Sequence, residues 1–454
     1  MVRVQSSALC ESSSIGGASP CQGEGRGFES RLSLKICRCG GTGIHARLKI
    51  LWPQKPCGFD SRQRHPGDWR NWLACMVWDH EVAGSNPVSP TKMKSTRPKF
   101  FKTLTGKKIP LPIFFPDATR AVLKTLDSED IKNTETLGVL VNTFHLFQDP
   151  GHEVIKNFKG VRNFMNWSGG VISDSGGFQV MSLAKTMGGN QAVTDTGVTF
   201  KMDGKKILFT PEMSIKLQLE LKSDMVVVLD DFTDPKDNYE EALISVNRTI
   251  KWAKECRQIF DKLVTQKKLT KAKTPYLLGV VQGGKYQDLR KYCTEELVKI
   301  GFDGLGYGGW PINKDGSFDY ESAKIIASST PKNYFLYALG IGKPHEIIAL
   351  VKTGWNIFDC VLPTRDARHK RLYVSKNSEY SDYEYYTPDK NIYYRDQRPV
   401  SEFCDCLLCQ KYSRSYLAHL FRIKEITALR LATIHNLRFY SKLMETLRPV
   451  YSGL

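Results

Sequence analysis

Two aspartates, Asp174 and Asp359, have the sequence surroundings of catalytic acids. Each follows a short apolar run of the kind that forms a buried strand, and each comes shortly before a glycine or proline. A pair of carboxyl groups can carry out double displacement at a sugar carbon, because one attacks the anomeric centre while the other moves the proton. Taken alone, either aspartate could equally cap a turn at the end of its strand.

A cationic segment follows Asp359. Pro363 has no N–H and is expected to end any strand ladder. Five basic side chains come next: Arg365, Arg368, His369, Lys370 and Arg371. Cations beside a carboxylate indicate chemistry on a nucleic acid, whose phosphates attract them. The plain alternative is a solvated basic loop.

A third acidic position, Asp230, has the chemistry to recognise a base. Its carboxylate could accept hydrogen bonds from the N–H edge of a purine. Gln282 and the backbone amides of Gly308 and Gly309 could pair with a purine carbonyl, because glycine lets the backbone approach closely. Phe178 is a candidate stacking face. The alternatives are a turn aspartate and a core phenylalanine.

Three thiols at CxCxxC spacing, Cys404, Cys406 and Cys409, predict a metal site. A tetrahedral Cys3His set is typical of structural zinc. Two histidines follow in a helical stretch, His419 and His435, and the spacing leaves the choice between them open. A metal whose four coordination positions are all filled by protein ligands, mostly thiolates, is typically structural, because a hydrolytic metal keeps one position open for water.

The charge balance narrows the class of partner. The 454 residues carry a formal net charge of +18, which attracts polyanions. No apolar run is long enough to span a bilayer and no basic amphipathic helix stands out, so nucleic acid is favoured over a membrane. No secretory signal peptide is visible, so the 12 cysteines are expected to be reduced thiols in a cytoplasm.

Residues 1–92 lack helical or strand periodicity. Three fragments there can each be back-translated into the T-arm signature of a tRNA gene: GFESR, GFDSR and GSNPV. We therefore expect residues 1–92 to be a mis-annotated or disordered extension of translated tRNA-gene-like sequence, with the natural start at Met93. No packed core is expected in it.

From Met93 on, short apolar runs alternate with longer helical segments, as in a parallel α/β protein. Eight strands are expected at Leu111–Phe115, Leu137–Val141, Gly170–Ser173, Asp224–Leu229, Tyr276–Val281, Gly304–Tyr307, Tyr334–Leu339 and Trp355–Phe358. Helices are expected at Pro211–Leu221, Tyr239–Val264, Gln287–Ile300, Tyr320–Ala327 and His345–Lys352. This pattern predicts an α/β fold of the (β/α)8 TIM-barrel type, with the strand ends converging on one active face. A doubly wound sheet is the runner-up, although no dinucleotide fingerprint follows the first strand.

Several motifs, in order, resemble the tRNA-guanine transglycosylases of bacterial type. They are SDSGGFQV, VQGG, GGW, LGIGKP, FDCVLPTR and the cysteine cluster followed by SRSYLAHL and IHNLRFY. That family has a (β/α)8 barrel with a zinc-binding insertion, and it exchanges guanine at the anticodon wobble position of tRNA for a 7-deazaguanine, a queuosine precursor. The resemblance implies tRNA and a 7-deazaguanine base as partners, a structural Zn2+ and a cytoplasmic homodimer without a membrane partner.

The resemblance also implies a role for each candidate residue. Asp359 corresponds to the nucleophile that forms a covalent ribosyl intermediate, and Asp174 to the general acid/base. The fourth metal ligand corresponds to His435. The remaining implied contacts are with the base (Asp230, Gln282, Gly309 and the stacking ring of Phe178), with ribose and the carboxylates (Asn142 and Gln179), and with tRNA (Arg365 and Arg368).

The chain departs from the family pattern at two places. Asp231 and Phe232 follow Asp230 where bacterial members usually have Glu and Cys, and GGWPINK stands where they read GGLAVGE. Lys314 therefore replaces a glutamate that helps recognise an aminomethyl group, which leaves the identity of the incoming base open.

We expect a catalytic domain over residues 93–454, with a zinc-binding subdomain at about 395–440. The alternative function is a non-catalytic, zinc-stabilised RNA-binding protein.

Overall fold

The computed structural model describes residues 97–453, apart from residues 180, 183–191 and 203. The extension expected at residues 1–92 and the start expected at Met93 lie outside the described residues. Both therefore stay predictions.

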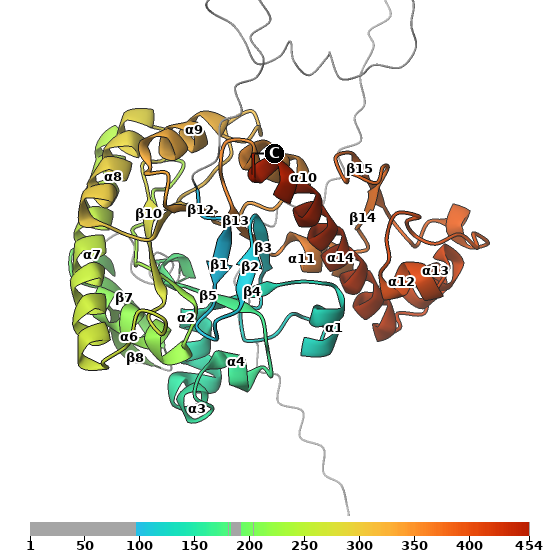
Figure 1. The fold of residues 1–454 in the computed structure, drawn as a ribbon, viewed down its shortest axis with the longest axis horizontal. Coiled ribbons are helices and arrows are strands. Elements are labelled where there is room, and N and C mark those ends of the chain that lie inside the picture. The colour runs from blue at the N-terminus through green and yellow to red at the C-terminus, as the bar shows by residue number, and fades with distance from the viewer. Residues whose placement is uncertain (1–96, 180, 183–191, 203, 454) are drawn as a thin grey trace, which may run out of the picture. The chain divides into compact units, whose positions relative to one another are not determined.

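Eight parallel strands form a barrel (Figure 1). They are β3 (Ile113–Pro116), β13 (Ile357–Cys360), β12 (Phe335–Ala338), β11 (Gly304–Tyr307), β10 (Tyr276–Val281), β9 (Met225–Val227), β5 (Gly170–Asp174) and β4 (Gly138–Asn142), in their order around the sheet. A parallel bridge between Asp117 and Leu140 brings the first and last of these strands together. Each strand overlaps a predicted run, so the (β/α)8 prediction is confirmed and the doubly wound alternative is wrong.

Strand β13 lies further along the chain than predicted. The sequence placed it at residues 355–358, but pairing continues to Cys360, with Asp359 opposite Phe115 of β3. The reason is the partner strand, which runs on to Pro116 and supplies further hydrogen-bonding groups. Asp359 therefore projects from a paired strand instead of a loop, and its backbone is held in place.

Helices follow most of the strands and cover the barrel (Figure 1). They are α6 (Pro211–Leu221), α7 (Tyr239–Gln266), α8 (Gln287–Ile300), α9 (Tyr320–Ser329), α10 (Pro344–Val351) and the shorter α11 (Leu362–Arg368). Five of them closely match the predicted segments. Helix α7 begins with a reciprocal capping box, in which Asn238 and Glu241 each bind the other's backbone N–H. No helix in the described ranges combines the length and apolar character needed to cross a bilayer.

Shorter elements surround the barrel and were not predicted, because a few residues carry no clear periodicity. Two small antiparallel sheets are formed by β1 (Phe100–Lys102) with β2 (Lys108–Pro110), and by β6 (Val193–Thr194), β7 (Gly197–Met202) and β8 (Lys205–Phe209). The short helices are α1 (Ser128–Asn133), α2 (Thr143–Leu146), a π-helical turn (Phe147–Gly151), α3 (His152–Asn157) and α4 (Val161–Phe164).

The carboxyl-terminal part packs along the barrel through one long helix, α14 (Figure 1). Its elements are β14 (Leu372–Ser375), β15 (Tyr383–Tyr386), a 3-10 turn (Asn391–Tyr393), α12 (Leu407–Lys411), α13 (Arg414–Arg422) and α14 (Ile426–Tyr451). The Asn436 amide on α14 donates to the carbonyl oxygens of Pro363 and Arg371, at 3.0 Å each. Helix α14 thereby holds α11, which directly follows the strand of Asp359.

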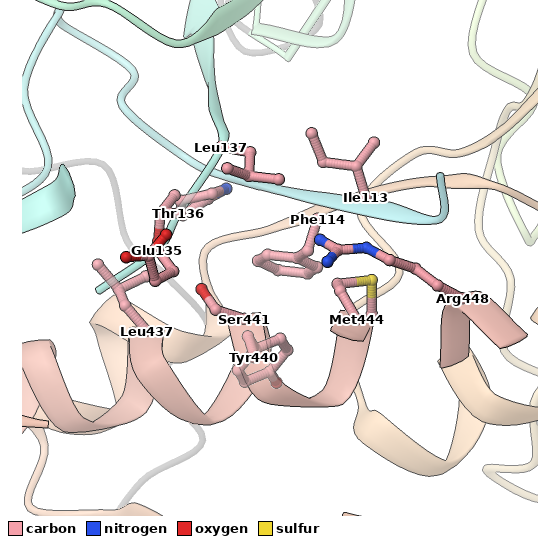
Figure 2. A pocket seen from close by; sticks show the side chains of 11 residues that line it. Ile113, Phe114, Glu135, Thr136, Leu137, Leu437, Tyr440, Ser441, Met444 and Arg448 are labelled. Atoms are coloured by element: carbon pink, nitrogen blue, oxygen red, sulfur yellow. The ribbon is translucent and has the colours of Figure 1, made fainter. Parts of the chain in front are cut away.

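A small cavity lies between β3 and α14, edged by Phe114, Tyr440 and Met444 (Figure 2). Its volume is about 20 Å³, which is room for roughly one water molecule. It is therefore a packing gap.

Candidate active site at the carboxyl end of the barrel

The barrel brings the two candidate acids to the same face. Asp174 is the last residue of β5 and Asp359 lies at the end of β13. Burial raises the pKa of Tyr337 on β12 well above its usual value, and the charges of Asp359 and Asp174 both raise that pKa further. Asp174 and Gly340 line the same cavity, and the Gly340 N–H donates to Asp359 Oδ1, so the two carboxyl groups lie beside one site.

Asp174 is held by three donors. The Asn142 side-chain Nδ2 donates to its Oδ2 at 2.7 Å, and the backbone N–H groups of Thr143 and Gly176 donate to its Oδ1 at 3.2 and 3.1 Å. Burial nevertheless raises the pKa of Asp174 to about 7, against the lowering effect of these donors. A carboxyl group that titrates near neutral pH can both give and take a proton.

Asp359 has a different set of neighbours. Asp359 is 6% exposed, and the Gly340 N–H donates to its Oδ1 at 2.8 Å. Burial raises the pKa of Asp359 to about 7, while the Gly340 amide and the Tyr337 hydroxyl lower it and the charge of Asp117 raises it. Near neutral pH a substantial fraction of Asp359 is therefore the carboxylate, the form that can attack carbon.

A cavity of about 300 Å³ opens beside Asp174. This volume lies at the small end of the range for ligand pockets and suits a single base. Five of the predicted site residues line it: Asp174, Phe178, Gln179, Asp230 and Gly309. Three of the four residues expected to contact a base, Phe178, Asp230 and Gly309, therefore surround one space with Asp174, although they come from distant parts of the chain.

Gln282 lies buried next to this cavity and orients Asp230. Its Nε2 donates to Asp230 Oδ2 at 2.7 Å, and its Oε1 accepts the Thr233 N–H at 3.2 Å. Burial raises the pKa of Asp230 to about 6, and the hydrogen bond from Gln282 opposes that increase. At neutral pH Asp230 is then mostly ionised and can accept N–H groups from a ligand.

Four aromatic rings line the cavity: Phe178, Phe232, Tyr307 and Trp310. Phe178 is 55% exposed and packs edge-to-face on Phe232, with 5.1 Å between ring centroids. Trp310, also 55% exposed, lines the same cavity. Phe178 was predicted from the sequence as a stacking face, but Phe232 and Trp310 were missed. Both stand where the chain departs from the family pattern, and that departure was the signal available.

The two predicted tRNA-binding arginines lie on α11. Arg365 is exposed, whereas the half-buried Arg368 donates to the Thr364 carbonyl at 2.8 Å. Arg368 lines a second cavity of about 500 Å³. The other charged or titratable residues of that cavity are Asp117, Arg120, Lys124 and His145. This lining is mainly basic, as a site for RNA phosphates requires.

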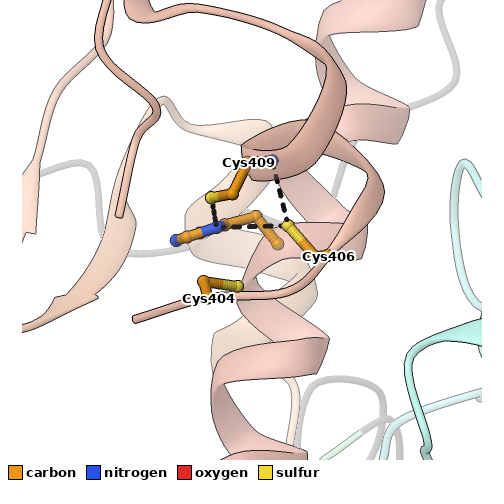
Figure 3. Close-up of side chains that lie close together, drawn as sticks. Cys404, Cys406 and Cys409 are labelled. Carbon is orange, nitrogen blue, oxygen red and sulfur yellow. Dashed lines mark hydrogen bonds between the residues drawn. The ribbon is translucent and has the colours of Figure 1, made fainter. Parts of the chain in front are cut away.

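The cysteine motif closes on a histidine of α14. The ligand atoms of Cys404, Cys406, Cys409 and His435 all lie within 4.8 Å of one another (Figure 3). His435 Nδ1 is 3.3 Å from Cys409 Sγ and 3.6 Å from Cys406 Sγ. Tetrahedral zinc places its nitrogen and sulfur ligands roughly 3.5–3.8 Å apart, so the four residues fit this metal. His419 is not part of the group.

Neighbouring contacts orient the cluster. His435 Nε2 donates to the Tyr373 carbonyl at 2.8 Å. A carbonyl only accepts, so Nε2 carries the hydrogen and Nδ1 presents its lone pair to the thiols. Asp405, between two of the cysteines, accepts from Arg438 Nε at 2.6 Å and from Lys442 Nζ at 3.0 Å. Both cations lie on α14, so the cysteine loop is tied to the helix that supplies the histidine.

Cys360, next to Asp359, is not a competing nucleophile. Burial raises the pKa of its thiol to about 12. The thiol therefore stays neutral, and a neutral thiol is a poor nucleophile. Cys360 is therefore a small buried residue of the barrel packing.

Known proteins match the chain over most of its length. The model of the family described as queuine tRNA-ribosyltransferase matches residues 96–450. The enzyme of that name from Blochmanniella pennsylvanica is 39% identical over 340 residues, which are 74% of this chain and 87% of the relative. Those from Psychrobacter sp. and Thermoanaerobacter sp. are each 38% identical, over 76% and 75% of this chain and 87% and 86% of their own lengths. The resemblance found in the sequence is thus confirmed, and the chain belongs to the queuine tRNA-ribosyltransferase family.

Proposed function

We propose that the protein exchanges guanine at the anticodon wobble position of tRNA for a 7-deazaguanine by double displacement, without cutting the RNA. Family membership supports a tRNA-guanine transglycosylase. The single observation that carries the mechanism is the pair of buried carboxyl groups, Asp174 and Asp359. Both have a pKa of about 7 and both lie at the carboxyl ends of barrel strands.

In the first displacement Asp359 acts as the nucleophile. One of its oxygens forms a bond to ribose C1′ as the bond from C1′ to guanine N9 breaks, and that electron pair leaves with the base. Asp174 in its protonated form gives its proton to the departing guanine. The product is a covalent ribosyl ester on Asp359, and the phosphodiester chain stays intact.

In the second displacement the incoming base takes the place of guanine. Asp174, now ionised, accepts a proton from the 7-deazaguanine, whose N9 forms a new bond to C1′ while the ester bond to Asp359 breaks. Both aspartates return to their starting states. The hydrogen bond from Asn142 to Asp174 keeps that carboxyl group aimed in both steps, and Gln179 completes the ribose contacts.

Base recognition is assigned to the cavity of about 300 Å³. Ionised Asp230 accepts hydrogen bonds from the N–H groups of the purine edge. Gln282 and the Gly309 amide donate hydrogen bonds to the carbonyl oxygen of the purine. Phe178 stacks on the ring face. Cation clustering on α11 and in the adjoining basic cavity supports Arg365 and Arg368 as contacts to tRNA phosphates.

The metal is proposed to be one Zn2+ held by Cys404, Cys406, Cys409 and His435. A four-ligand thiolate-rich site leaves no open position, so the ion would supply structural stability to the subdomain at about 395–440 of a catalytic domain that spans residues 93–454. No step of the reaction passes through it.

Trapping a tRNA adduct tests this function directly. The protein is incubated with tRNA, denatured and run on a denaturing gel, and we expect a tRNA–protein band that added guanine or a suitable 7-deazaguanine releases. Testing several 7-deazaguanines for release identifies the incoming base. If the protein binds tRNA but forms no adduct and exchanges no labelled guanine, it is an RNA-binding protein and the proposal is wrong.

The pH profile of guanine exchange is a second test. We expect kcat/KM to peak near pH 7 and to fall about tenfold per pH unit on each side. On the acid side Asp359, with its pKa raised to about 7, gains a proton and cannot attack. On the alkaline side Asp174, with a similar pKa, loses the proton that the leaving guanine needs. A profile that stays flat from about pH 5 to 9 while the protein remains folded would contradict these roles.

We also propose that the enzyme is a cytoplasmic homodimer, following the resemblance. Light scattering of the active protein should then give twice the mass of one chain. An active species with the mass of a single chain would exclude the dimer as a requirement for exchange.

A further inference from the structure

Arg290, on α8, is a fully buried cation behind the wall of the base cavity. Its Nη1 donates to the carbonyl oxygens of Val281 at 2.8 Å and Gly308 at 2.6 Å, and its Nε donates to that of Gly284 at 3.0 Å. Its guanidinium carbon lies 4.5 Å from the centre of the Tyr307 ring. No carboxylate in the described part of the chain forms an ion pair with it.

A buried charge without a counter-ion is costly, so its contacts call for an explanation. Three carbonyl oxygens and an aromatic face offset part of that cost. The buried Nη2 has no hydrogen-bond partner among the described residues. A Cβ placed on Gly309 would lie only 3.3 Å from that nitrogen, so the free end of the cation lies directly behind this glycine.

The hydrogen bond from Arg290 to the Gly308 carbonyl also sets the direction of the Gly309 N–H. In a trans peptide the C=O and the following N–H point in opposite directions. The Gly308 carbonyl points to Arg290, so the Gly309 N–H points away from Arg290, and both glycines line the cavity. No acceptor for this N–H is found among the described residues. Gly309 has φ of +80°, a conformation that favours glycine.

We propose that Arg290 is a positioning residue that aims the Gly309 amide at the carbonyl oxygen of the purine. The inference rests on the proposed function, because it takes the cavity to be the base site. Arg290 does not touch the base. It holds the Gly308–Gly309 peptide, and its unpaired positive charge behind that peptide favours the electron-rich carbonyl of a leaving or entering base.

A purely structural arginine and a positioning arginine differ in one measurable respect. A structural arginine would affect all bases alike, whereas a positioning arginine affects bases according to the acceptor at C6. 6-Thioguanine keeps the N–H groups of guanine but carries sulfur, a weaker acceptor, in place of the carbonyl oxygen. The ratio of the 6-thioguanine Ki to the guanine KM therefore reports on the amide of Gly309.

The experiment compares three full-length variants with the natural protein: Arg290→Met, Arg290→Lys and Arg97→Met. Arg97 is the matched control, since it is another buried arginine and donates to the backbone carbonyls of Ala327 and Pro331. Guanine exchange into tRNA gives KM for guanine and for tRNA, competition gives Ki for 6-thioguanine, and melting curves report folding.

We expect Arg290→Met to raise the guanine KM roughly 10- to 100-fold, the loss associated with a hydrogen bond to a charged or strongly polar group. The tRNA KM should change less than about twofold and the preference for guanine over 6-thioguanine should largely disappear. Arg290→Lys keeps the charge but reaches fewer carbonyls, so it should restore part of the preference. Arg97→Met should lower the melting temperature and leave the preference intact.

An unchanged preference in folded Arg290→Met, or equal weakening of both bases, overturns the positioning role. Loss of cooperative melting in both Arg290 variants also overturns it, because the arginine would then support the barrel. If the natural protein itself exchanges no guanine, the proposed function fails and this inference fails with it.

Discussion

Asp359→Asn is expected to lower the rate of guanine exchange by at least about 10,000-fold and to leave no trapped tRNA adduct. The amide is close in size to the carboxyl group and can still accept the Gly340 N–H that binds Asp359 at 2.8 Å. It cannot form the ester to C1′. Labelled guanine incorporation and the denaturing gel measure the two losses separately, and gel shift should show that tRNA binding remains.

The same substitution should stabilise the protein at alkaline pH. Burial raises the pKa of Asp359 from 3.8 to about 7, so between about pH 4 and 7 the folded state keeps a proton that the unfolded state has lost. The native protein is therefore destabilised as pH rises through this window, whereas the asparagine variant has no such charge to bury. We expect a gain on the order of 2–4 kcal/mol at pH 8 that shrinks toward pH 4, measured by urea unfolding.

Asp261→Asn, on the exposed side of α7, is a suitable control and should change neither exchange nor the pH dependence of stability. An Asp359→Asn variant that still forms the adduct would exclude Asp359 as the nucleophile. A stability gain that is equal at all pH values would show that the buried charge is not its cause.

Removal of the metal is the second change with a large expected effect. Cys406→Ser should lose the bound ion, which elemental analysis of the natural protein should show as one zinc per chain, and should lower the free energy of unfolding of the carboxyl-terminal part by several kcal/mol. Stability is lost because the ion would join the cysteine loop to α14, the helix that carries His435 and both cationic partners of Asp405.

The effect should reach the tRNA site. Asn436 on α14 holds the Pro363 and Arg371 carbonyls on either side of the segment that carries Arg365 and Arg368. Loss of zinc should therefore raise the KM for tRNA more than the KM for guanine. Cys256→Ser, at a buried thiol of α7, should keep the full metal content. Unchanged melting and tRNA affinity after zinc is removed would contradict a structural role.

The site divides into residues that motifs revealed and residues that they did not. Asp174, Asp230 and Gln282 were found because each follows a buried strand, and parallel strands of a barrel end on one face. Phe232, Trp310, Tyr337 and Arg290 were not found. Departure from the family motifs was the available signal for Phe232 and Trp310. Tyr337 and Arg290 act through neighbours far away in the sequence, such as Gly308 for Arg290, and a single side chain on a strand or helix carries no sign of such a contact.

The approximate places of the eight barrel strands, the bounds of five covering helices and the cysteine motif were readable from local patterns, because apolar runs, helical periodicity and CxCxxC spacing act over a few residues. The chemical state of the acids was not readable in that way. Burial in the closed barrel raises the pKa of Asp174 and Asp359 to about 7, and an isolated aspartate has no such property. The choice of His435 as the fourth member of the cluster likewise has its physical cause in the packing of α14, which brings Nδ1 to the thiols while Nε2 is held by Tyr373.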